Sequence, residues 1–346
     1  MSNFKTSKYR NIAASLGSRE SNYEHLKVAD HIIESNALTC NHNYVCYIDS
    51  AGNGSAIALL PLTNTGTTHK PSSINIHQPL IRGHTQPVQD IQFNPFKPTQ
   101  LASCAMDGLI KLWEIPESEG ITEDLTTPIQ TLYDTDKGPV RELAYHIYSN
   151  NILLTRGSRN TSLFDLTTNK QISGTNKTTH NAPTGDIQSI CWSYDGNTIA
   201  LTGKDKKLKL IDIIRSNNNN TISSIVNETA AHTGAKGSRV LWLGETPNLI
   251  TCGHNSYQER EMFLWDSRQL TVPVKRERFD ASSGLLMPIY DPDANLLVVG
   301  GRGDSFVRLY EVSASGDDVA LVLNHVPVGQ YVYMLFSSSV ALYNIV

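Results

Sequence analysis

Three residues of the types used in nucleophilic catalysis lie near one another in the sequence: His84, Ser103 and Asp107. In a serine hydrolase, a histidine held by an aspartate takes the proton from a serine hydroxyl. The same side chains can also form a buried hydrogen-bonded chain, and Trp113 follows them with an indole N–H that needs an acceptor. Such a chain is tolerated in a core only when its donors and acceptors are satisfied. We expect these four residues to hold a scaffold together and not to catalyse a reaction.

The surrounding stretch, from Gly83 to Glu114, supports this structural interpretation. It begins with Gly-His, ends with Trp-Glu, and alternates short apolar runs with turns at Asn94-Pro95 and Asp107-Gly108. This layout is typical of one blade of a WD-repeat β-propeller. The sequence therefore predicts an all-β fold built from such blades.

Two further motifs suggest chemistry or adhesion, but their context supports neither. Gly203-Lys204-Asp205-Lys206-Lys207 lacks the second glycine and the strand-loop-helix context of a phosphate-binding P-loop. Arg302-Gly303-Asp304 is an adhesion tripeptide, but no secretory signal precedes it, and Asp304 fits a blade turn. No paired carboxylates and no histidine-metal set remain. We expect no enzyme, no metal, no cofactor and no small-molecule substrate.

A two-residue motif recurs every 45 to 54 residues along the chain. Its first residue is large and apolar, and its second residue is acidic in every copy except the first, as in Trp113-Glu114 and Trp265-Asp266. A chain of 346 residues then holds about seven such units. We predict one seven-bladed propeller domain over residues 1–346, in which an N-terminal strand and the C-terminal strands close the seventh blade and remove the exposed edges. The predicted blades lie near 22–62, 80–115, 129–166, 178–213, 226–267 and 278–312, with the last formed by 313–346 together with 4–14.

Several units carry residues that match the polar chain of the second unit. The fourth has His180 and Asp205, the fifth has His232 and ends at Trp265, and the sixth has Asp304. The third unit has no Gly-His, so we expect packing alone to hold it. All of these residues are predicted to be structural.

The composition limits the classes of partner and compartment. A net charge of −4 with 18% charged residues is not that of a nucleic-acid-binding protein. The five cysteines contain no C-x-x-C pair and are odd in number, which indicates reduced thiols and a cytoplasmic location.

The C-terminal run from 319 to 346 has no charged residue. It could be a membrane anchor, three buried strands or a poorly folded tail. Polar residues interrupt it before 18 apolar residues accumulate, so we expect strands and no membrane span. No sustained heptad follows Glu311, so no coiled coil is predicted.

Several longer segments resemble the coronin family, in order along residues 3 to 312. Ser7-Lys8-Tyr9-Arg10 is similar to the Ser-Lys-aromatic-Arg motif at the start of coronins, and Tyr23-Glu24-His25-Leu26-Lys27 to a following Tyr-Glu-x-apolar-basic motif. Gly52 to Ala56 resembles a segment of the coronin first blade, and Lys204 to Lys207 and Ala281 to Pro288 resemble segments of its fourth to sixth blades. The number and order of these segments make the resemblance specific.

The resemblance implies binding to actin filaments, with Lys27 at the position of the family's filament-binding basic residue. Filaments are acidic, so a basic cluster would speed association and make binding sensitive to salt. The alternative is that these residues are ordinary solvated positions, some of them guarding strand edges. The candidate actin-binding residues are Lys5, Lys8, Arg10, Lys27, Lys204, Lys206, Lys207 and Lys209.

The implied partners are F-actin and other cytoskeletal proteins, and the implied location is the actin-rich cortex of the cytoplasm. Self-association and contact with the actin-related-protein complex depend on the family's coiled-coil region, so neither is carried over. The alternative function is a generic WD-repeat adaptor or scaffold for protein complexes, because a propeller fold does not fix the partner.

Overall fold

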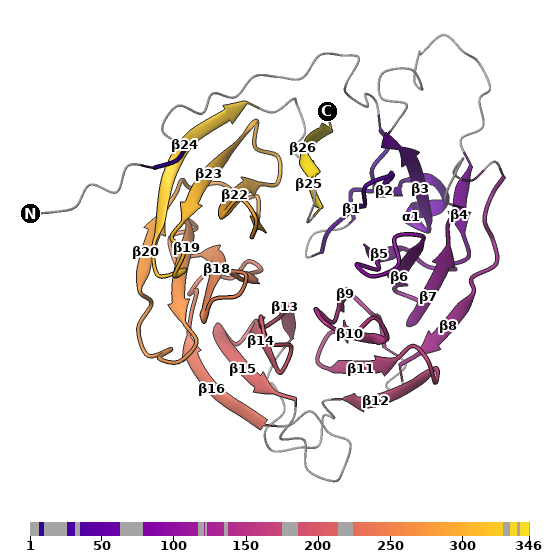
Figure 1. Cartoon of the computed structure of the whole chain (residues 1–346), viewed down its shortest axis with the longest axis horizontal. Helices are drawn as coiled ribbons and strands as arrows, with labels where there is room; N and C mark the ends of the chain where they lie inside the picture. Colours follow the sequence, from indigo (N-terminus) through magenta and orange to yellow (C-terminus); the bar gives the residue numbers. More distant parts are fainter. Residues whose placement is uncertain are drawn as a thin grey trace, which may run out of the picture.

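The computed structural model describes residues 7–9, 26–31, 35–62, 79–116, 121, 123–134, 138–174, 186–213, 224–327, 333–337 and 340–345. Within these ranges, six four-stranded antiparallel sheets stand around a central axis (Figure 1). We number them blades 1 to 6 in chain order. The strands of each blade follow one another from the axis to the rim, so the chain completes one sheet before it begins the next.

The strands of blades 1 to 3 are β1 (Leu38–Cys40), β2 (Tyr44–Asp49), β3 (Ala56–Pro61) and β4 (Leu80–Arg82); β5 (Val88–Phe93), β6 (Gln100–Ala105), β7 (Leu109–Glu114) and β8 (Gln130–Tyr133); and β9 (Glu142–Tyr145), β10 (Ile152–Arg156), β11 (Thr161–Asp165) and β12 (Lys170–Gly174).

The strands of blades 4 to 6 are β13 (Ile187–Trp192), β14 (Thr198–Gly203), β15 (Lys207–Asp212) and β16 (Ser224–Ala230); β17 (Arg239–Trp242), β18 (Asn248–His254), β19 (Arg260–Asp266) and β20 (Lys275–Arg278); and β21 (Leu286–Asp291), β22 (Leu296–Gly301), β23 (Phe306–Val312) and β24 (Val319–Pro327).

The burial of each strand follows its place in the blade. Strand β6, in the middle of blade 2, is buried at every residue because the neighbouring blades cover both of its faces. Strand β20, at the rim of blade 5, alternates between half-buried and exposed residues along Lys-Arg-Glu-Arg. Position in the blade therefore decides which strands carry apolar runs.

The hydrophobic core consists of layers between adjacent blades. Trp113 of blade 2 shares a layer with Ile57 of blade 1, and Trp265 of blade 5 shares one with Leu208 of blade 4. Burying such large side chains between sheets stabilises the contact between one blade and the next.

The antiparallel order places the connections on two opposite faces of the propeller. The turns between second and third strands and the links between blades lie on one face, which we call the connection face. The turns between first and second strands and between third and fourth strands lie on the other, which we call the hairpin face. The only helix among the described residues, α1 (Ala51–Gly54), is one such turn on the connection face, and no described helix is long and apolar enough to cross a membrane.

The predicted all-β propeller is confirmed, with one difference in how the repeats relate to the sheets. The predicted unit 80–115 contains β4 of blade 1 and β5 to β7 of blade 2. The predicted unit 129–166 is offset in the same way, and β24, which falls in the predicted seventh unit, is the rim strand of blade 6. A predicted unit can therefore contain strands of two neighbouring sheets.

Two more strands, β25 (Tyr333–Ser337) and β26 (Val340–Ile345), form a separate antiparallel pair. They lie between blade 6 and blade 1, where β25 contacts β1 (Figure 1). This is the position that a seventh blade would fill. Of residues 4–14, which are expected to supply the N-terminal strand, only 7–9 are described, and they contain a turn and no strand. Seven blades and ring closure therefore stay predictions.

Candidate functional site

The four residues of the second unit form the polar chain that the sequence suggests. His84 Nδ1 lies 3.0 Å from Asp107 Oδ2, His84 Nε2 lies 2.8 Å from Ser103 Oγ, and the Trp113 indole donates to Ser103 Oγ at 2.8 Å. Burial raises the pKa of Asp107, but hydrogen bonds from His84 and from backbone N–H groups outweigh it and leave that pKa below its usual value. Ser103 is fully buried. Its hydroxyl is engaged and out of reach of a substrate, so the geometry is that of a scaffold.

Blade 5 contains an equivalent chain with different residue types. His232 lies 2.9 Å from both Glu261 Oε1 and Thr251 Oγ1, and the Trp265 indole donates to Thr251 Oγ1 at 2.9 Å. The sequence indicated His232 and Trp265 but not their partners. Glu261 lies on strand β19 and not in the preceding turn, where an acid is expected, and this shift hides it from a pattern based on spacing.

The third unit is not held by packing alone, and that expectation was wrong. Asp134 accepts hydrogen bonds from Asn160 Nδ2 at 3.0 Å and from Ser162 Oγ at 3.1 Å. Gln171 also donates to Ser162 Oγ, at 3.1 Å. A chain without histidine or tryptophan therefore replaces the usual one.

The remaining predicted scaffold residues have other partners, and His180 lies outside the described residues. Asp205 of blade 4 accepts from the ammonium of Lys209, whose side chain is only 3% exposed. Asp304 lies 2.8 Å from Nη1 of Arg260, a buried residue of blade 5 that also binds Asp280. The ion pair between Asp304 and Arg260 thus connects blade 6 to blade 5.

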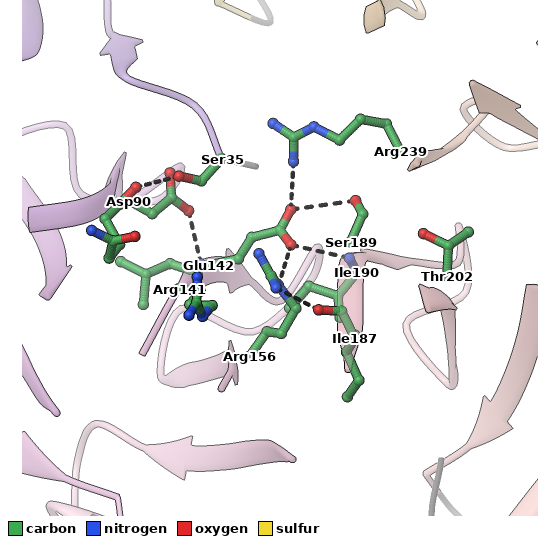
Figure 2. Close-up of polar contacts among 12 residues, drawn as sticks. Ser35, Asp90, Arg141, Glu142, Arg156, Ile187, Ser189, Ile190, Thr202 and Arg239 are labelled. Carbon is green, nitrogen blue, oxygen red and sulfur yellow. Dashed lines mark hydrogen bonds and ion pairs between the residues drawn. The ribbon is translucent and has the colours of Figure 1, made fainter. Parts of the chain in front are cut away.

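Figure 2 shows a buried cluster of charged side chains near the axis of the propeller. The sequence analysis does not predict this cluster. Glu142 of blade 3 accepts from Arg156 Nε at 2.9 Å, from Arg239 Nη1 of blade 5 at 3.0 Å, and from the backbone N–H of Ile190 in blade 4 at 3.2 Å. One carboxylate therefore connects three blades. Breaking such a buried pair leaves an uncompensated charge, which destabilises strongly.

Asp90 of blade 2 lies beside this cluster. Its Oδ2 accepts from the backbone N–H of Leu143 at 2.8 Å. Burial, reinforced by the nearby Glu142, raises the pKa of Asp90 to about 8. The described residues hold no group of three or more His, Cys, Asp or Glu that could bind a metal ion, and the charges of the cluster are occupied by one another. Its arrangement fits a structural role.

Five basic residues gather on the connection face at blades 3 to 5. Lys204 and Arg159 both bind Asp186, at 2.9 and 3.1 Å, and Lys207 binds Glu228 at 2.6 Å. A hollow of about 270 Å³ between blades 4 and 5 is lined by four of the five. We call these residues the basic patch: Arg159, Lys204, Lys206, Lys207 and Lys236.

The structure separates the other predicted actin-binding residues. Lys27 is exposed on the connection face, where its carbonyl accepts from Ser50 N at 2.8 Å. Lys8 lies 5.0 Å above the ring of Tyr9, whose hydroxyl donates to Ala294 O in a turn of the hairpin face. Lys209 is buried against Asp205, so it does not belong to a basic surface. Lys5 and Arg10 lie outside the described residues.

Two family models match the chain. The WD domain, G-beta repeat, matches residues 76–114 and 174–212. A model described as a domain of unknown function, DUF1899, matches residues 2–67. The WD-repeat matches cover the unit that contains His84 and the unit that contains Lys204.

Known proteins with similar sequences are coronins. Human coronin-2A is 30% identical over 312 residues, which are 90% of this chain and 56% of that protein. Coronin-A of Dictyostelium discoideum is 34% identical over 308 residues, which are 89% of this chain and 64% of that protein. The chain therefore spans between half and two thirds of the length of these relatives.

A solved structure agrees with the sequence comparisons. The crystal structure of the WD40 domain of Toxoplasma gondii coronin superposes with a TM-score of 0.78 at 25% identity, covering 94% of this chain and 81% of that one. The matched proteins are coronins, and the matched structure is the WD40 domain of a coronin. The ordered sheets, the polar chains between them and these similarities identify the chain as a WD-repeat propeller of the coronin family.

Proposed function

We propose that this propeller binds actin filaments and helps to organise the actin cytoskeleton. The proposal rests on membership of the coronin family and, within the molecule, on the basic patch of the connection face. F-actin is the proposed partner, other cytoskeletal proteins are further candidates, and the actin-rich cortex of the cytoplasm is the proposed location.

The charge balance within the patch is the observation that carries this proposal. Lys204 and Lys207 are each paired with an acid, but Lys206 and Lys236 make no ion pair with any described residue. Lys236 Nζ donates only to the carbonyl of Ser283, at 3.2 Å. Two ammonium groups beside one hollow therefore remain available to carboxylates of an acidic partner.

Lys27 is proposed as a second contact on the same face. It follows from the family motif, and it is exposed at blade 1, on the far side of the ring from blade 4. Lysine keeps the charge but not the planar fork of arginine, so its contact would be a point charge and not a bidentate pair.

Co-sedimentation with actin filaments at low and moderate salt tests the proposal. The wild-type chain should pellet with filaments and be released as salt rises, because screening weakens contacts between exposed charges. A double variant, Lys206→Glu with Lys236→Glu, should weaken binding by about ten-fold or more, since each reversal replaces attraction with repulsion. Lys27→Glu should weaken it in the same direction.

Lys97→Glu is the matched control. Lys97 is exposed in the turn between β5 and β6 on the hairpin face, so a charge reversal there, equal to that of Lys27→Glu and half that of the double variant, should leave binding unaltered. A chain that stays in the supernatant at every salt concentration would contradict filament binding and favour the adaptor alternative. Equal losses in Lys97→Glu and in the patch variant would show only an effect of net charge.

A further inference from the structure

A cavity of about 850 Å³ opens on the hairpin face, on the opposite side of the propeller from the basic patch. Its wall comes from the axial strands β9, β13, β17 and β21 and from the turns that follow them. Its deep end is lined by Glu142 and Arg239 of the buried charge cluster. This volume is within the range of pockets that bind small molecules or peptide side chains.

Aromatic side chains from four blades line the mouth of this cavity. Tyr148 is 61% exposed and Tyr194 is 38% exposed, although both are large and largely apolar. The ring of Tyr194 lies 6.5 Å from that of Trp242, and Tyr290 lies on the blade 6 side. Exposed aromatic rings that gather at a cavity mark a binding surface more often than a packing defect.

The charge of the lining is negative at the mouth. Among the described residues, Arg239 is the only basic one that lines the cavity, and it donates to Glu142 and to the amide oxygen of Asn36, each at 3.0 Å. Glu245 and Asp293 lie in turns at the mouth of the cavity, and neither forms an ion pair with a described residue. Two acids therefore remain without a countercharge beside the aromatic rings.

Aromatic faces together with carboxylates form the environment that binds organic cations. The negative face of each ring attracts a guanidinium or ammonium group, and an adjacent carboxylate completes the contact. We propose that this mouth binds an arginine or lysine side chain of an extended segment of a partner protein. The contact would be independent of filament binding, because the two surfaces lie on opposite faces.

The test is calorimetric titration of the full chain, without actin, with two capped peptides. One has the sequence Ala-Arg-Pro-Arg-Ala, and the other replaces both arginines with citrulline, which keeps the shape and removes the charge. The arginine peptide should bind about ten-fold or more tightly than the citrulline peptide, as expected for a cation held between rings and carboxylates.

Variants then locate the contact. The double variant Glu245→Gln with Asp293→Asn should reduce binding of the arginine peptide to the level of the citrulline peptide. Tyr148→Ala should weaken it several-fold, because an exposed ring contributes cation–π attraction without supporting the core. Glu123→Gln, an exposed acid in the link between β7 and β8 at the rim of the propeller, should change nothing.

Three results would overturn the proposal. One is equal affinity for the two peptides, and another is binding that the mouth variants leave unchanged. The third is no binding of the arginine peptide up to about 1 mM, a concentration at which even a weak specific contact of about 4 kcal/mol is detected. Because no filament is present, none of these results bears on the basic patch.

Discussion

At the scale of single residues, the most unusual group is Asp90. Its carboxyl is buried beside Glu142, and its pKa of about 8 means that much of it carries a proton at neutral pH. The nearby Glu142 is bound by two arginines. A proton on Asp90 therefore avoids a further unbalanced negative charge in this core.

This assignment predicts how stability depends on pH. Between pH 3.8 and about 8 the folded chain holds a proton on Asp90 that the unfolded chain has released. The contribution of this proton to the free energy of unfolding is therefore fully present below this range. It decreases as pH rises through the range, by at most about 1.4 kcal/mol per pH unit. Asp90→Asn, which cannot ionise, should remove this component and gain in stability relative to wild type as pH rises.

Urea unfolding at several values from about pH 5 to about pH 9 measures the difference between wild type and variant. Asp165→Asn serves as the control, because hydrogen bonds from Thr167 and Thr168 lower the pKa of that exposed carboxyl. Its contribution is lost only as pH falls into the acid range. A difference for Asp90→Asn that does not vary with pH would contradict the proton assignment.

At the scale of elements, the turns of the hairpin face fix where the axial strands end. The turn after β13 needs a left-handed residue, which Gly196 provides with φ of +70°. His146 of blade 3 packs directly against this glycine, and its Nε2 lies 3.1 Å from the Gly196 carbonyl. The turn therefore joins two blades and does more than reverse the chain.

Gly196→Ala should destabilise through both causes. The added methyl would lie 2.5 Å from His146 Nε2, and the backbone would be strained as well. We expect a loss of about 2 kcal/mol or more in the free energy of unfolding, measured with urea. Gly303→Ala is the matched control, because φ there is +83° but no heavy atom lies within 4 Å of the added methyl. It should cost only the strain of about 1 kcal/mol, and equal losses would exclude a specific role for His146.

Elements of this kind were predictable where a local pattern specifies them. The turn at Asp107-Gly108 and the chain through His84 and Trp113 carry residue types at fixed spacing, so the sequence alone indicates them. The link from Glu142 to Arg239 joins residues about one hundred positions apart, and no local pattern records such a contact. A lysine in a strand is expected to face water, but Lys209 lies at one of the four buried central positions of β15.

At the scale of the whole molecule, the position of β25 and β26 beside β1 bears on how the ring ends. Blade 1 has a separate apolar cluster, which includes Val45, Tyr47 and Leu60, in addition to the layer that it shares with blade 2. Blade 6 has a similar cluster around Val298 and Leu309, with Tyr9 packed against it. Both clusters need a neighbour to exclude water, and we propose that a seventh blade supplies it.

Deletion of residues 328–346 tests this closure. If the terminal pair completes the ring, its loss should expose the cluster of blade 1 and lower the melting temperature by more than about 5 °C. The truncated chain should also be cut faster in limited proteolysis. Deletion of the polar run 217–220 is the control and should change neither value. A truncated chain as stable as the full one would show that the ring does not depend on this segment.

The basic patch and the acidic mouth also have a joint consequence. The basic patch on one face and the two acids of the mouth on the other contribute a component of dipole moment along the propeller axis. Near a negatively charged polymer, this dipole experiences a torque within about 10 Å at 0.1 M salt. This component would turn the lysines toward the polymer before any side chain touches it, and the aromatic mouth would face away from the polymer.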